Sequence, residues 1–162
     1  MSAQQAETQP ESGFPDVERT QGFTYKAFPE NAAVVRREVG AVLREWGFGE
    51  VEFDLRLCVD EAFTNALCHG DGPEITITVT SHGPAVRIEV EDHAGPDSTL
   101  VLEVPWEAAI AVTAPELDKV AERGRGLFLI AGLSTCWGIL PRDCGAKTVW
   151  FELDTSATAT AS

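Results

Sequence analysis

Apolar residues follow two different spacings along the chain, which predict helices first and strands afterwards. Over residues 31–46 and again over 52–69 they recur every three or four positions, the spacing that gives an α-helix one apolar face. Glycines follow both segments and predict where the helices end. The apolar stripe of the second segment comprises Leu55, Cys58, Val59, Ala62, Phe63, Ala66 and Leu67.

From residue 75 onward the spacing changes to two. Ile75, Ile77 and Val79 alternate with threonines, and the alternation resumes at Val86 after a turn over residues 81–84. This pattern predicts a β-hairpin with one buried face. Further elements are predicted as a strand over residues 22–28, a helix over 127–133, and strands over 135–140 and 147–153.

The order of these elements predicts the fold class. Helices would cover one face of a mixed, largely antiparallel sheet, which gives an α/β (α+β) two-layer sandwich. The domain is predicted to cover residues 22–154. Residues 1–20 are polar and Pro-containing, and residues 155–162 are only Thr, Ser and Ala, so both ends are predicted to be disordered tails.

The charge of the chain restricts its partners. Twelve Lys and Arg against 26 Asp and Glu give a formal net charge of -14. Such a charge disfavours direct binding to nucleic acid or to an anionic membrane.

The polar N-terminus lacks the apolar stretch of a secretory signal, and the four cysteines form no C-x-x-C pair. We therefore expect a cytoplasmic protein with reduced thiols.

Two polar residues stand beside the apolar stripe of the second predicted helix. Glu61 and Asn65 are four positions apart, so they lie on the same side of the helix. A carboxylate in that place can take a proton from a hydroxyl, and a carboxamide oxygen can ligate Mg²⁺. The spacing is common by chance, however, and taken alone it is better explained by two ordinary solvated helix residues.

Three other short segments combine glycine with polar residues. Asp92 ends an alternating strand, Gly124 and Gly126 open a helix where backbone N–H groups can meet phosphate, and Thr148 follows a turn. Taken singly, each has an ordinary explanation as a turn or a helix entry. Between them, residues 94–123 follow no clear period, and a connection of that length is more often functional than idle.

Together the four segments resemble the N, G1, G2 and G3 boxes of the GHKL (Bergerat-fold) ATPase superfamily. The runs LRLCVDEAFTNALCHG (residues 55–70), GRGLFLIAGLSTCWG (124–138) and GAKTVWFEL (145–153) are similar to the anti-sigma-factor serine/threonine kinases, especially stand-alone actinobacterial ones. The resemblance covers residues 28–153 and implies ATP and Mg²⁺ as ligands.

The resemblance also implies roles for individual residues. Glu61 would be the catalytic base and Asn65 the Mg²⁺ ligand. Asp92 would hold the adenine amino group with Thr148 nearby, and residues 94–123 would form the ATP lid. The residues implied in nucleotide binding are Asn65, Asp92, Gly95, Lys119, Arg123, Gly124, Arg125, Gly126, Leu127 and Thr148.

Two functions are compatible with this resemblance. The first is a serine/threonine protein kinase that phosphorylates a STAS-domain (anti-anti-sigma) partner in transcription regulation. The second is a non-catalytic, nucleotide-dependent module that sequesters a sigma factor or another regulator. Glu61 favours the kinase, whereas Ala94 and Pro96, which stand where the superfamily has glycines, favour the module. Relatives often dimerise, so a homodimer is possible.

Overall fold

The computed structural model describes residues 17–70, 72–92, 125–141 and 146–158. The predicted lid over residues 94–123 lies outside these ranges, as do Gly95 and Gly124. Within them the elements are β1 (Arg19–Lys26), α1 (Asn31–Glu45), the 3-10 helix η1 (Gly49–Val51), α2 (Glu52–His69), β2 (Glu74–His82), β3 (Ala85–Asp92), α4 (Arg125–Leu133), β4 (Cys136–Pro141), β5 (Lys147–Asp154) and α5 (Thr155–Thr158).

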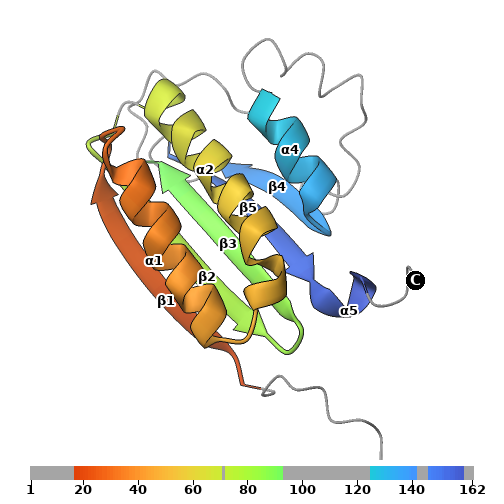
Figure 1. The fold of residues 1–162 in the computed structure, drawn as a ribbon. Coiled ribbons are helices and arrows are strands. Elements are labelled where there is room, and N and C mark those ends of the chain that lie inside the picture. Colours follow the sequence, from red (N-terminus) through yellow and green to blue (C-terminus); the bar gives the residue numbers. More distant parts are fainter. Residues whose placement is uncertain (1–16, 71, 93–124, 142–145, 159–162) are drawn as a thin grey trace, which may run out of the picture.

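The described elements form a two-layer sandwich. The five strands make one sheet in the order β1-β2-β3-β5-β4, and every pairing between them is antiparallel. Helices α1, α2 and α4 lie across one face of this sheet (Figure 1). The predicted fold class is confirmed.

Both ends of the described domain differ in detail from the prediction. Strand β1 begins at Arg19 rather than at residue 22, and threonine pairs such as Thr24 and Thr76, with Oγ1 atoms 3.2 Å apart, join it to β2. At the other end, α5 occupies residues that were predicted to belong to a tail. The backbone N–H and the hydroxyl of Thr155 both donate to the carbonyl oxygen of Pro84, at 3.0 and 2.9 Å.

The main core lies between α2 and the sheet. Six of the seven predicted stripe residues on α2 are buried, from Leu55 to Ala66, and Leu67 packs at the margin. From the sheet, alternate residues of β2, β3 and β5 complete this core, including Ile77, Ile88 and Phe151. The apolar residues with helical spacing and those with strand spacing therefore pack against each other in one apolar layer.

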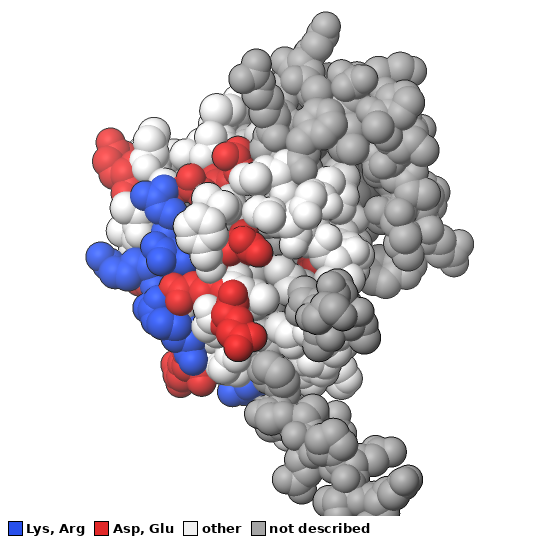
Figure 2. Space-filling model, turned by 45° about the vertical axis from the view of Figure 1, so that its right-hand side comes forward, with Lys and Arg blue, Asp and Glu red and all other residues white. Residues whose placement is uncertain are grey.

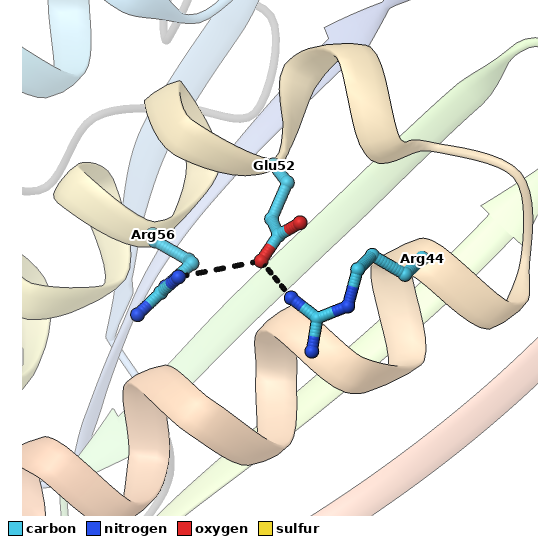
Figure 3. A network of polar contacts seen from close by, with 3 residues as sticks. All are labelled: Arg44, Glu52 and Arg56. Carbon is cyan, nitrogen blue, oxygen red and sulfur yellow. Dashed lines mark hydrogen bonds and ion pairs between the residues drawn. The ribbon is translucent and has the colours of Figure 1, made fainter.

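Charged side chains join α1 to α2 on the outer surface. Glu52 of α2 accepts from Arg44 of α1 and from Arg56 one turn further along its own helix, the latter at 3.3 Å (Figure 3). Arg36 and Asp60 make a second bridge, at 2.6 Å. Basic side chains gather on this flank of the molecule, beside acidic ones (Figure 2). Because the arginines are half-exposed, each bridge adds little stability, but together they mark the side of α2 that faces α1.

Three cysteines fall within the described ranges, and all are free thiols: Cys58, Cys68 and Cys136. Burial first, and then the negative charges of Asp54 and Glu61, together raise the pKa of the Cys58 thiol to about 12. Cys58 therefore stays neutral at physiological pH and acts as a core residue.

None of the helices within the described ranges combines the length and apolarity that a bilayer crossing requires.

Two phenylalanines of α2 provide a direct test of this packing. Phe63 is fully buried, whereas Phe53, three turns earlier, is 72% exposed. We predict that Phe63→Ala lowers the free energy of unfolding by about 3–5 kcal/mol, because a core cavity replaces the ring. The matched Phe53→Ala should change it by less than about 0.5 kcal/mol. Urea unfolding followed by circular dichroism measures both, and equal losses would contradict the placement of α2.

Candidate functional site

Four segments that are distant in sequence meet at one end of the sandwich. The last turn of α2, the end of β3, the start of β5 and the first turn of α4 all lie at this end (Figure 1). The strand register agrees, because Asp92 at the end of β3 stands opposite Lys147 at the start of β5. The structure thus brings together the segments that carry Asn65, Asp92 and Gly126.

Asp92 is the polar member of an otherwise apolar series. Val86, Ile88 and Val90 precede it at every second position of β3, and all face the helices. The residue is only 3% exposed. A buried carboxylate is costly unless a positive charge or hydrogen-bond donors accompany it. Such a group at the end of a strand is a candidate for ligand recognition.

The backbone of Gly70 packs directly against Asp92. A Cβ atom built on Gly70 would lie 3.3 Å from Cβ of Asp92 and 2.5 Å from the carbonyl oxygen of Ala66. A side chain at this position would collide with the carbonyl oxygen of Ala66 and crowd Asp92, which explains a glycine where the chain leaves α2 beside β3. Gly70 therefore sets how near the end of α2 lies to the carboxylate.

Lys147 shares the inner face of the sheet with Asp92. Its Nζ atom lies 3.6 Å from Oδ2 of Asp92, and their side chains are 18% and 4% exposed. The sequence reasoning did not select this lysine. The sequence does contain a signal for its position. Lys147 begins a series at every second residue of β5 that continues with Val149, Phe151 and Leu153, and residues spaced by two in a strand share one face.

Thr148 lies on the opposite face of the sheet. It stands opposite Glu91 in the strand register, and its hydroxyl donates to Oε2 of that residue at 3.4 Å. Residues directly opposite each other in antiparallel strands project to the same side. The structure therefore does not bring Thr148 toward Asp92, although Thr148 itself is fully buried.

Glu61 and Asn65 lie on the side of α2 that faces away from α1. Both are partly exposed, at the margin of the buried stripe. Asp60 faces α1 through its bridge with Arg36, and one residue further along a helix the direction turns by about 100°. Since α1 and α4 flank α2 on either side (Figure 1), Glu61 and Asn65 face the α4 side.

Helix α4 begins at this end of the molecule with Arg125, Gly126 and Leu127. The first N–H groups of a helix have no partners within the helix, and the helix dipole adds positive potential there. An anion is favoured at such a terminus. The preceding Gly124 and the basic Arg123 and Lys119 lie outside the described ranges.

The described residues include no group of three or more His, Cys, Asp or Glu side chains that could hold a metal ion alone. Mg²⁺ in nucleotide sites keeps several waters and takes phosphate oxygens, with only one or two protein ligands. Asn65, the residue predicted to be such a ligand, is partly exposed on the α4 side of α2.

Comparisons with known proteins concern the family and the fold of this chain. The family model of the histidine kinase-like ATPase domain matches residues 25–148. The crystal structure of the RsbU and RsbW domains of Rv1364c from Mycobacterium tuberculosis matches 83% of this chain, with a TM-score of 0.57 and 20% identity. This chain covers 32% of that chain, about a third of its length, and at this identity the likeness concerns the fold. No curated protein matches this chain.

The close approach of Gly70 to Asp92 can be tested with two glycines. We predict that Gly70→Ala lowers the free energy of unfolding by about 1–3 kcal/mol, because the methyl group would collide with the carbonyl oxygen of Ala66 at 2.5 Å and crowd Cβ of Asp92 at 3.3 Å. In α4, a Cβ atom on Gly132 would meet nothing within 4 Å. Gly132→Ala should therefore be neutral or stabilising, by up to about 1 kcal/mol. Urea unfolding of both variants decides, and a stable Gly70→Ala protein would refute the contact.

Proposed function

We propose that this chain, which belongs to the histidine kinase-like ATPase domain family, binds Mg-ATP and phosphorylates a serine or threonine of a partner protein. The ATPase domain implies ATP binding. The observation that supports the site most is the convergence of Asp92, the Asn65 side of α2 and the first turn of α4 at one end of the sandwich.

The adenine base would meet Asp92. The carboxylate is held on the inner face of the sheet, and it is an acceptor with more than one lone pair available. The exocyclic amino group of adenine is a donor, so the two groups are complementary. A hydrogen bond to a buried charged acceptor is among the stronger ones in proteins.

The phosphates would extend from the base toward α4. The first turn of α4 with Gly126, together with the preceding Gly124, would offer N–H groups, and the helix dipole favours the negative charge of the phosphates. Lys119, Arg123 and Arg125 would add positive charge in a chain that is otherwise strongly acidic. The segment over residues 94–123, including Gly95, is proposed as the lid over the nucleotide.

Glu61 and Asn65 would act on the reacting end of the nucleotide. One helical turn of about 5.4 Å separates them, so each can serve a different atom. Asn65 would ligate Mg²⁺, which neutralises phosphate charge. Glu61 would accept the proton of the attacking serine or threonine hydroxyl. The new P–O bond forms at the γ-phosphorus, the bond to the bridging oxygen breaks, and ADP leaves with the electron pair.

The partner proposed for this reaction is a STAS-domain anti-anti-sigma protein in the cytoplasm, which makes the chain an anti-sigma-factor-type kinase.

A second function is supported by Ala94 and Pro96 in the G1 segment, because alanine resists positive φ and proline has no N–H. Such a segment favours a nucleotide-dependent module that sequesters a sigma factor without phosphoryl transfer. Incubation with Mg-ATP and a STAS-domain protein, followed by mass spectrometry for a phosphoserine or phosphothreonine, separates the two functions.

The nucleotide-binding assignment predicts opposite outcomes for two neighbouring substitutions. Asp92→Asn should weaken Mg-ATP binding roughly tenfold or more, because a charged acceptor is lost. Thr148→Val, on the other face of the sheet, should leave the affinity nearly unchanged. Isothermal titration calorimetry measures both, and thermal unfolding verifies that each variant is folded. The absence of ATP binding to the unmodified chain would refute the proposed function.

The catalytic assignment predicts a separation of chemistry from binding. Glu61→Gln keeps the shape of the side chain but removes the base, so phosphoryl transfer should fall by about a hundredfold or more while ATP affinity changes little. Asn65→Ala should also weaken the Mg²⁺-dependent part of ATP binding. The control is Asp60→Asn, the adjacent acid that faces Arg36, which should retain the normal rate. Normal transfer by Glu61→Gln would refute its role as the base.

A further inference from the structure

The geometry points to Lys147 as a second residue that recognises the nucleotide base. Its ammonium group donates a hydrogen bond to the ring nitrogen N1 of adenine, while Asp92 accepts a hydrogen bond from the amino group. This inference rests on the proposed function, since it requires that a nucleotide binds beside Asp92. The two residues stand opposite each other in the register of β3 and β5, and Nζ lies 3.6 Å from Oδ2.

Lys147 occupies an unusual position in β5. The next residues on its face are Val149, Phe151 and Leu153, and all three are buried in the core. Its own side chain is mostly covered, and its ammonium is held beside an almost fully buried carboxylate. The simplest structural explanation is that Lys147 only neutralises Asp92. The side chain of Lys147 nevertheless keeps 18% of its surface exposed, so it is not sealed off from the end of the sandwich where the proposed site lies.

The pair can bind a base without coming apart. An ammonium group has three donors and a carboxylate has about four acceptor positions, so each can keep the other and still serve one further group. The pair then presents one acceptor and one donor side by side. The Watson–Crick edge of adenine presents the complementary order, with the amino group as donor and N1 as acceptor.

The same pair discriminates against guanine in that pose. Guanine has a carbonyl at the position of the amino group and an N–H at position 1. With Asp92 opposite position 6, both contacts would be mismatched, acceptor to acceptor and donor to donor. Unsatisfied polar groups in a mostly buried site carry the full cost of their desolvation. Lys147 would therefore extend the preference for adenine that Asp92 alone provides.

Nucleotide analogues test this inference on the unmodified full-length chain. In 1-deaza-ATP a C–H group replaces N1, whereas 7-deaza-ATP changes the other side of the base and serves as the control. We expect 1-deaza-ATP to bind about tenfold more weakly than ATP, since a hydrogen bond from a charged donor is lost. The 7-deaza analogue should bind like ATP. Calorimetry in the presence of Mg²⁺ measures all three affinities.

Substitution of the lysine completes a thermodynamic cycle. Lys147→Met should weaken ATP about tenfold and bind ATP and 1-deaza-ATP equally, because the donor to N1 is gone. Lys147→Arg keeps a donor and should restore discrimination between the two nucleotides. Lys26→Met, at an exposed lysine of β1, should behave like the unmodified chain.

The outcomes separate this inference from the proposed function. If the unmodified chain binds ATP and 1-deaza-ATP equally, or if Lys147→Met binds ATP as tightly as before or more tightly, Lys147 does not read N1, while ATP binding stands. Preferred binding of GTP would show that the pair reads guanine in a shifted pose and would also overturn the inference. If none of these nucleotides binds, the proposed function itself fails.

Discussion

The packing of α2 against the sheet is the contact on which the rest of the structure depends. Leu55, Val59 and Phe63 are completely buried there, and each buried side chain of this size contributes about 1.5–3 kcal/mol relative to exposure. Because these residues form one narrow stripe, burying them also sets the rotation of the helix about its axis. Glu61 and Asn65 thereby face α4 rather than α1. The proposed chemistry on α2 is positioned by apolar packing that takes no part in it.

The same packing brings α2 to the end of β3. Gly70 leaves so little room beside Asp92 that an added Cβ atom would lie 3.3 Å from Cβ of Asp92, and Asp92 is only 3% exposed. Lys147 then supplies the positive charge that a buried carboxylate requires. The chain has a net charge of -14 overall, but Lys147 places a positive charge locally at this end of the sandwich. Binding of an anionic nucleotide would depend on the groups that touch it, which in the proposed site include the first turn of α4.

The bridges between α1 and α2 and the proposed nucleotide site lie at opposite ends of the sandwich. The bridges of Arg44, Glu52 and Arg56 join α1 and α2 at the beginning of α2, far along the helix from Gly70. The proposed nucleotide site lies at the other end, where α2 and β3 both finish and where β5 and α4 both begin.

The sequence alone determined the elements and the residues that carry polar groups. A spacing of three to four can satisfy only a helix and a spacing of two only a strand, so α2, the β2–β3 hairpin and β5 were predictable to within a residue or so. Glu61, Asn65 and Asp92 were identified because they interrupt or border these regular patterns. The resemblance to one superfamily then connected segments that a periodicity argument leaves separate, and the family comparison supports it.

Only the tertiary structure decided which residue of β5 stands opposite Asp92. The adjacent positions Lys147 and Thr148 point to opposite faces, and the pairing of β3 with β5 shows that the lysine, not the threonine, stands beside Asp92. A shift of one residue in that register would exchange the two, because side chains alternate with a period of two. Local sequence patterns do not predict the register between two strands that are more than fifty residues apart. That register follows from burying Val149 and Phe151 in the common core, which is a property of the whole fold.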